Sequence, residues 1–192
     1  MMNYESMMRL FVALPLAKGI EKKLFAAQQS LSQARTRVTW VAQDCMHITV
    51  KFIGDFPISD IFRLSHLIGD SLKGQPPSRL HLKGIDFFPN ERSPRVIKVN
   101  SVDETELLKH SHDFLDKAMR QLDVPSEDRK YTSHLTLGRI KNTADISTLV
   151  RLAGEYREFG FGSMDVSGLT LFASKLDRNG PKYTVIEEFF CD

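Results

Sequence analysis

The pattern His-x-Thr-x occurs twice in this 192-residue chain, each time inside a stretch that alternates like a β-strand. The copies occupy His47–Val50 and His134–Leu137. In an extended backbone, side chains two positions apart point to the same face. Each copy therefore presents an imidazole beside a hydroxyl, with two apolar residues on the opposite face. The fold has to bury two apolar strand faces and leave two His–Thr pairs on the others.

The same order of expected elements surrounds both copies. A strand, an amphipathic helix and the motif strand are followed by a second helix and an alternating run. The first set spans 9–14, 17–35, 46–53, 59–73 and 79–85, and the second spans 95–100, 107–122, 131–138, 145–156 and 163–172. A hairpin loop at Asp177–Gly180 then precedes a final alternating run, 183–189.

This order predicts a duplicated α+β unit. Two copies are too few for a solenoid, so we expect them to pack about a pseudo-two-fold axis that brings both histidines to one cleft. The alternative is a chance resemblance between two ordinary strand–helix–strand units. The matched position of the motifs within the two sets favours duplication.

Composition narrows the function classes. The formal net charge of +2 is too small for a protein that coats nucleic acid by charge alone. Cys45 and Cys191 form no CxxC pair for zinc or redox chemistry, and Cys45 is expected to pack as a small buried or edge thiol. The apolar stretch 7–16 is short and interrupted by Arg9, so neither a signal peptide nor a membrane partner is expected. The expected location is the cytoplasm.

Two paired histidines suit a reaction that needs both a proton donor and a proton acceptor. Imidazole titrates near pH 6.5, so one ring can be protonated while the other is neutral. Phosphodiester cleavage is such a reaction, because the attacking water loses a proton and the departing oxygen gains one. A lone strand histidine is more often structural, and it is the pairing of His47 with His134 that favours catalysis.

The threonines fit the same chemistry. Hydroxyls of Thr49 and Thr136 can donate to the non-bridging oxygens of a phosphate held between the two motifs. Preorganised donors aimed at developing negative charge are often the largest catalytic term. For either threonine alone, the ordinary preference of threonine for strands is an equal explanation.

Two basic residues are candidates for further substrate contacts. Lys51 lies four residues after His47 and should share its face, although a solvated lysine at the end of a sheet is an equal alternative. Arg139 lies five residues after His134 and should face the apolar side unless a bulge or the strand end turns it. Gly138 occupies the position that corresponds to Lys51.

Metal catalysis is the main competing explanation, and the sequence disfavours it. Neither motif has an HExxH or HxH pattern, or a carboxylate at ligand spacing. The other four histidines are expected on helix or strand surfaces away from the motifs: His66, His81, His110 and His112. We therefore expect no metal ion and no cofactor.

The chain resembles the two-histidine (2H) phosphoesterase superfamily, and within it the RNA 2′,3′-cyclic phosphodiesterases, historically called the 2′-5′ RNA ligase family. The resemblance covers almost the whole sequence. It is carried by the stretches RLFVALPL, VTWVAQDCMHITVKFIG, SPRVIKV, YTSHLTLGRI, FGFGSMDVSGLTLFAS and GPKYTVIEEF, in that order.

The resemblance implies an α+β fold over residues 1–192, a single bilobal domain whose lobes are mainly antiparallel sheets with helices outside and the cleft between them. It implies metal-independent hydrolysis of RNA 2′,3′-cyclic phosphate ends to 2′-phosphomonoesters, and a possible reverse 2′-5′ ligation. By carry-over, His47 matches the proton donor to the 3′ oxygen and His134 the acceptor that activates water. Thr49 and Thr136 match the phosphate-binding positions. The expected partner is an RNA 3′ end or a nucleotide-like ligand, and the expected state is a monomer.

Two departures leave room for altered substrate contacts. The family commonly has proline before the second histidine, where this chain has Ser133, and an aromatic or apolar residue where it has Lys98. An RNA-end or nucleotide-binding module without turnover remains an alternative, as does a 2H enzyme for 2′-5′ oligoadenylate or small cyclic phosphates. Substrate specificity is expected to lie in loops such as 87–95 and 123–130.

Overall fold

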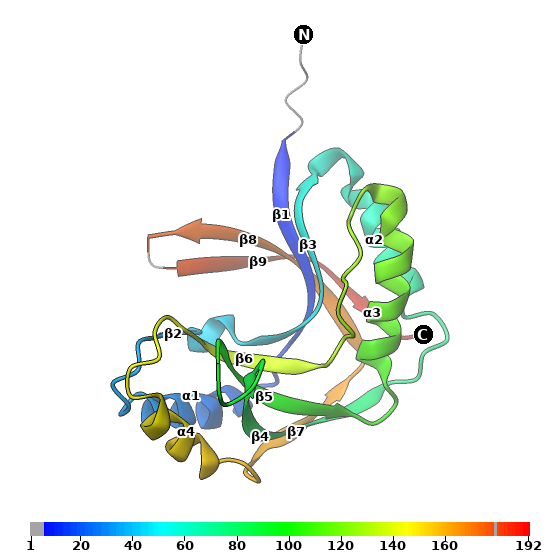
Figure 1. The fold of residues 1–192 in the computed structure, drawn as a ribbon. Helices are drawn as coiled ribbons and strands as arrows, with labels where there is room; N and C mark the ends of the chain where they lie inside the picture. Colours follow the sequence, from blue (N-terminus) through cyan, green and yellow to red (C-terminus); the bar gives the residue numbers. More distant parts are fainter. Residues whose placement is uncertain (1–5, 179) are drawn as a thin grey trace.

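The computed structural model describes residues 6–178 and 180–192, and over this part of the chain the strands form one antiparallel sheet (Figure 1). The expected α+β fold is confirmed. The strands are β1 (Met7–Pro15), β2 (Val38–Trp40), β3 (His47–Pro57), β4 (Ser78–Phe88), β5 (Val96–Asp103), β6 (His134–Ile140), β7 (Gly160–Val166), β8 (Gly168–Asp177) and β9 (Gly180–Phe190). The α-helices are α1 (Ile20–Leu31), α2 (Ile61–Asp70), α3 (Leu107–Ala118) and α4 (Ile146–Gly154).

The strand order has the symmetry of a duplicated unit. It runs β7-β4-β5-β6-β3-β1-β8-β9, with β2 paired to β6. Reading outward from the centre, β6 corresponds to β3, β5 to β1, β4 to β8 and β7 to β9. The two motif strands therefore meet in the middle of the sheet.

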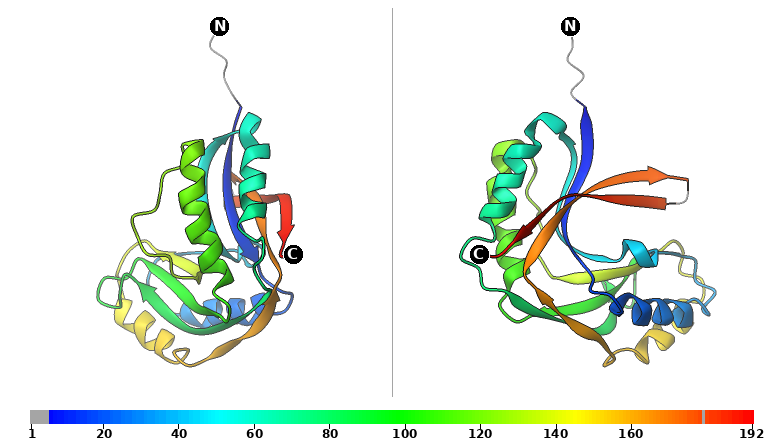
Figure 2. Two further views of the ribbon diagram at one scale, coloured as in Figure 1. Left: turned by 90° about the vertical axis from the view of Figure 1, so that its right-hand side faces the viewer. Right: turned by 180° about the vertical axis from the view of Figure 1, so that it is seen from behind.

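The two lobes exchange segments between the two sequence units. Helix α1 follows β1 in the chain but packs with α4 beside β7, whereas α3 follows β5 but packs with α2 against β3 (Figures 1 and 2). Strand β4 likewise leaves the first unit to pair with β5, and β8 leaves the second to pair with β1. Each lobe thus contains parts of both units, with its helices on the outer side of the sheet.

Apolar periodicity correctly placed the helices and most strands. In the first helix, the apolar residues that recur every three or four positions are buried, from Ile20 through Leu24 and Ala27 to Leu31. No described helix combines the length and apolar composition that a crossing of a lipid bilayer requires.

Two local features differ from the expected ranges. The run 163–172 is two strands, because the chain leaves the sheet at Ser167; β7 then lies at one end of the sheet and β8 pairs with β1. The short strand β2 was not expected, since three residues are too few to show an alternating pattern. The hairpin loop at 177–180 is confirmed by the β8–β9 pairing, although Asn179 itself lies outside the described residues.

Candidate active site

Both motifs line one pocket of about 530 Å³. His47 and Thr49 enter it from β3, and His134 and Thr136 enter it from β6. The apolar partners of the motifs, such as Ile48, are fully buried on the other face of the sheet. The structure therefore brings together the two His–Thr pairs that the sequence places 87 residues apart.

The two imidazoles are anchored in the same way. Nδ1 of His47 lies 2.8 Å from the carbonyl oxygen of Cys45, and Nδ1 of His134 lies 2.7 Å from the carbonyl oxygen of Thr132. A carbonyl only accepts, so Nδ1 carries the proton in both rings. The tautomer is thereby fixed, and Nε2 is the nitrogen left for chemistry in each ring.

His47 is enclosed by aromatic rings. The ring centroids of Phe11 and Tyr183 lie 4.9 Å and 5.3 Å from that of His47. This burial lowers the pKa of His47 below the ordinary 6.5, although the hydrogen bond to Cys45 acts in the opposite direction. Nε2 of the neutral ring lies 3.1 Å from Oγ1 of Thr49, which donates to it.

Lys51 does not share the face of His47, so that prediction is wrong. In the pairing of β3 with β1, Thr49 lies opposite Ala13 and Lys51 lies opposite Val12, which leaves Val50 as the extra residue of a β-bulge. The bulge reverses the alternation after Val50. Lys51 is turned away from the pocket and buried, and the next residue, Phe52, lines the pocket instead.

A matching bulge in β6 turns Arg139 toward the pocket. Ile97 of β5 pairs with Gly138 and Lys98 pairs with Thr136, so Leu137 is the extra residue. Arg139 then lines the pocket. This is the condition under which the sequence allowed Arg139 a role, and Arg139 and Phe52 occupy equivalent positions in the two motifs.

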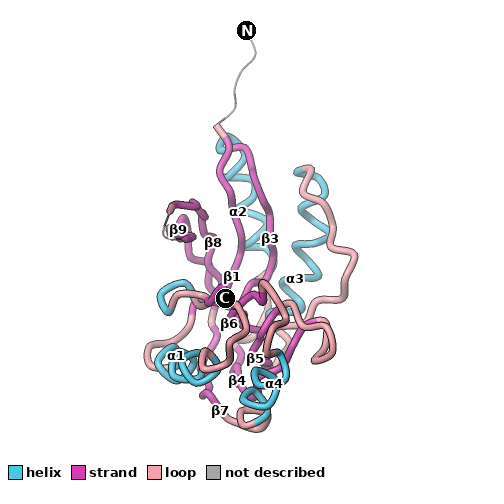
Figure 3. Tube along the Cα trace, turned by 60° about the vertical axis from the view of Figure 1, so that its left-hand side comes forward, coloured by secondary structure: helices cyan, strands magenta, loops and turns pink. Residues whose placement is uncertain are grey.

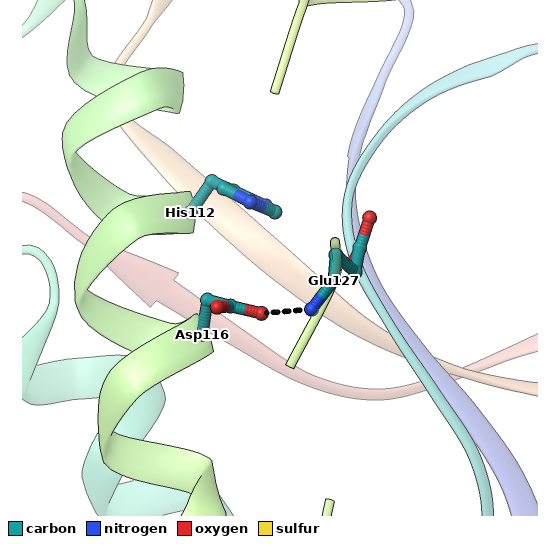
Figure 4. A group of neighbouring side chains, drawn as sticks. All are labelled: His112, Asp116 and Glu127. Atoms are coloured by element: carbon teal, nitrogen blue, oxygen red, sulfur yellow. Dashed lines mark hydrogen bonds between the residues drawn. The ribbon is translucent and has the colours of Figure 1, made fainter. Parts of the chain in front are cut away.

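The buried Lys51 side chain lies in a cluster behind the sheet. Its ammonium donates to Asp116 and Glu127, and His112 lies beside them on α3 (Figure 4). The expectation that His112 lies on a surface away from the motifs is wrong, because it is buried and its Nδ1 lies 2.7 Å from the carbonyl oxygen of Val50. His112, Asp116 and Glu127 have metal-ligand chemistry, but a lysine cation already bridges the two carboxylates.

The rest of the pocket comes from segments that the sequence did not single out. Arg9 adds a second basic side chain, with its guanidinium 4.9 Å above the ring of Phe52. Trp40 of β2 and Tyr183 of β9 add aromatic rings to the wall, and in Figure 1 the β8–β9 hairpin projects on the same side of the molecule as β2. For Tyr183, the sequence predicted only a place in the alternating strand 183–189 and no role in a site.

The charge of the described pocket is positive. Its described lining includes Arg9 and Arg139 and no Asp or Glu. Burial and the neighbouring Asp44 raise the pKa of the Cys45 thiol at the pocket wall, so it stays protonated and is a poor nucleophile. The electrostatics therefore favour an anion beside the two imidazoles.

The expected specificity loops do not line this pocket. None of its described lining residues comes from 87–95 or 123–130. Ser133 and Lys98, the two departures from the family pattern, also lie outside it: Ser133 Oγ pairs with Ser101 Oγ at 2.5 Å, and Lys98 donates to Asn100. Strand β2 and the β8–β9 hairpin do line the pocket, so they are better placed to contact a bound ligand.

Comparisons with known proteins agree with this geometry. A family model described as LigT like Phosphoesterase matches residues 14–98 and 101–183, so each span contains one motif. The RNA 2′,3′-cyclic phosphodiesterase of Methanothermobacter thermautotrophicus is 33% identical over 181 residues, which cover 94% of this chain and 97% of that protein. Its namesake from Methanocaldococcus jannaschii is 30% identical over 184 residues, 95% of this chain and 100% of that protein.

A solved structure shows the same fold. The crystal structure of the protein TT0787 of Thermus thermophilus matches with a TM-score of 0.78 and 28% identity, and the match covers 95% of this chain and 97% of that one. With both spans of the family model matched, this chain belongs to the LigT-like phosphoesterases of the two-histidine superfamily.

Proposed function

We propose that this protein hydrolyses the 2′,3′-cyclic phosphate at an RNA 3′ end to a 2′-phosphomonoester, without a metal ion. The observation that carries the proposal is the pocket in which two equally anchored His–Thr pairs meet, with Arg9 and Arg139 beside them and no carboxylate among the described lining residues. A phosphodiester is an anion whose cleavage uses one proton donor and one acceptor.

The anchoring leaves Nε2 available in both rings alike, so the family resemblance assigns the role of each histidine. Nε2 of His134 accepts a proton from water as the water oxygen bonds to phosphorus. The bond from phosphorus to the 3′ oxygen breaks, and Nε2 of His47 donates a proton to that oxygen. Thr49 and Thr136 donate to the non-bridging oxygens, where negative charge develops, and Arg139 and Arg9 add positive charge.

Substrate binding prepares His47 for this role. In the free protein, burial lowers the pKa of His47, which favours the neutral ring that accepts from Thr49. A bound phosphodiester places a negative charge beside the ring, and an adjacent negative charge raises the pKa of an imidazole. The protonated ring then donates to the leaving oxygen, and the Thr49 hydroxyl is released to bind the phosphate.

The names of the relatives support the substrate class. Two proteins called RNA 2′,3′-cyclic phosphodiesterase match nearly the full length of this chain at 30% identity or more. The proposal extends to a monomer that acts on RNA ends in the cytoplasm. It also includes the reverse 2′-5′ ligation, in which a ribose 5′ hydroxyl replaces water.

Product analysis tests the proposal. Purified protein is incubated with EDTA and an end-labelled RNA oligomer that carries a 2′,3′-cyclic phosphate. We expect full conversion to the 2′-phosphate. A 3′-phosphate would reverse the assigned roles, loss of activity in EDTA would establish metal dependence, and tight binding without turnover would show a nucleotide-binding module. The same assay with 2′-5′ oligoadenylate and small cyclic phosphates determines whether another phosphodiester is preferred.

A further inference from the structure

The two motif strands touch at a single point in the sheet. Ile48 opposite Leu135 is the one residue pair that joins β3 to β6 in the described part of the chain. Both strands bulge shortly after this pair. Backbone pairing therefore fixes the separation between His47 and His134 at one position, which is a weak constraint for two groups that must flank one phosphorus atom.

Side chains from behind the sheet hold the bulge of β3 at three successive residues. The Tyr131 hydroxyl donates to the carbonyl oxygen of Thr49 at 3.1 Å. Nδ1 of His112 lies 2.7 Å from the carbonyl oxygen of Val50. At the third residue, the ammonium of Lys51 itself donates to Asp116 and Glu127. The bulge is therefore bound to α3 and to the segment that leads into the second motif.

Lys51 makes the strongest of these connections. Its ammonium donates to Asp116 at 2.7 Å, to Glu127 at 3.1 Å and to the carbonyl oxygen of Pro125 at 3.3 Å. An ammonium has three donors, so all of them are used. Only 1% of the side chain is exposed. Asp116 also accepts from the backbone N–H of Glu127 at 2.9 Å (Figure 4).

The network continues to the second histidine. Tyr131 stacks on His112, with ring centroids 4.3 Å apart, and the next residue, Thr132, supplies the carbonyl that anchors Nδ1 of His134. In Figure 1 the chain that follows α3 runs between α3 and β3 before it enters β6, and Figure 3 shows α3 on one side of β3. The segment bound by Lys51 is therefore the one that orients the ring of His134.

We propose that Lys51 is a positioning residue that sets the spacing between the two His–Thr pairs. It touches no substrate; it fixes the segment from Pro125 to Thr132 against the bulge after Thr49. This inference rests on the proposed function. It predicts that loss of Lys51 impairs the reaction more than it impairs binding of a ground-state ligand.

The test uses the double variant Lys51→Met with Asp116→Asn. Lys51→Met alone leaves two carboxylates without their cation, so the second change removes one of those charges and supports folding. We expect a folded protein whose kcat on cyclic-phosphate RNA is about 10²-fold lower and whose KM changes by less than about threefold. Affinity for orthovanadate, which mimics the phosphoryl transition state, should fall by a similar factor, while affinity for inorganic phosphate changes little.

Two further variants keep the result interpretable. Lys109→Met is the matched control, because it breaks an ion pair with Asp113 on the same helix α3 on the half-exposed side; its kcat and vanadate affinity should equal those of the parent. Tyr131→Phe removes one hydroxyl from the network and covers the case in which the double variant fails to fold. In Tyr131→Phe, kcat and vanadate affinity should fall together, each by about the same factor as the other.

The inference is overturned if the double variant folds and keeps parental kcat and vanadate affinity. If the double variant is unfolded, the same result for Tyr131→Phe overturns it. A parallel loss of vanadate and phosphate affinity would also overturn it, since that marks general damage to the pocket. Failure of the proposed function has a different signature, namely a parent protein that does not turn over the RNA. In that case the ratio of vanadate to phosphate affinity in parent and variants still tests the positioning role.

Discussion

Two hydrogen bonds to backbone carbonyls determine what His47 and His134 can do. Each carbonyl belongs to the residue two positions before the histidine and fixes the proton on Nδ1. The two-residue side-chain period of a strand predicted that His and Thr of each motif share a face. The duplicated order of elements predicted that the two pairs meet. Neither pattern gave a sign of the tautomer, which depends on carbonyl directions, or of the burial among aromatic rings that lowers the pKa of His47.

Alanine at either histidine should reduce turnover without unfolding the protein. A positioned acid or base contributes about 10²–10⁴-fold, or about 3–5 kcal/mol of barrier. His47→Ala and His134→Ala are compared with the exposed control His66→Ala in single-turnover assays and thermal unfolding. A phosphodiester with a 4-nitrophenolate leaving group needs no proton donor and should reduce the defect of His47→Ala alone. If either histidine variant keeps a near-parental rate on RNA, its catalytic role is wrong.

The pKa of His47 should move on ligand binding. Burial holds it below 6.5 in the free protein, and the charge of a bound phosphate raises it. NMR titration of the imidazole resonances with and without inorganic phosphate measures both values, with His66 as an exposed reference. An unchanged His47 titration in saturating phosphate would show that the anion does not bind beside this ring.

At the scale of elements, the β-bulges decide which residues enter the pocket. A strict alternation places Lys51 beside His47 and Arg139 on the apolar face, and the structure shows neither, because Val50 and Leu137 are extra residues. The sequence allowed for such a bulge at Arg139 but not at Lys51. A bulge leaves little trace in one sequence, because these extra residues are as apolar as those of a regular buried strand. Phe52 was missed for the same reason.

Gly138 holds the position in the second motif that Lys51 holds in the first. Strand β2 packs so close to Gly138 that it leaves no room for a side chain. A Cβ there would lie 2.6 Å from Val38 and 2.9 Å from Trp40. Gly138→Ala should therefore displace β2 and cost about 1–3 kcal/mol of stability, as overpacking usually does. Urea unfolding measures the loss, and altered Trp40 fluorescence reports the displacement.

Gly154→Ala at the end of α4 is the matched control, since a Cβ there meets nothing within 4 Å. Its free energy of unfolding should equal or exceed that of the parent. Equal stability of the Gly138 and Gly154 variants would show that the contact between β2 and β6 tolerates a methyl group.

At the scale of the whole molecule, the two sequence units interleave. The duplicated order of elements was sufficient to predict an α+β fold with the motifs in one cleft. It did not reveal that α1 and α3 each pack in the lobe that contains the other unit's motif strand. Such an exchange is a property of long-range packing, and the amphipathic pattern of a helix does not specify which sheet its apolar face covers.

The cluster of Lys51, Asp116 and Glu127 behind the sheet should make the free energy of unfolding fall at low pH. Burial of Asp116 opposes its ionisation, but the hydrogen bonds from Lys51 and Glu127 outweigh it, so its pKa lies below 3.8. A carboxyl with a lowered pKa stabilises the fold above its unfolded pKa, and that contribution is lost as pH falls through the folded value. Urea unfolding between about pH 7 and pH 3 should show a larger loss for the parent than for Asp116→Asn. Parallel curves for the two proteins would contradict this account of the cluster.

The most direct test of the two-histidine reaction is the pH dependence of kcat/KM on cyclic-phosphate RNA in EDTA. The parent should give a bell, because one imidazole must be protonated and the other neutral. His47→Ala should lose the alkaline limb and His134→Ala the acidic limb. A parent profile set by one ionisation, or two variants that keep both limbs, would contradict the assignment of the reaction to these two histidines.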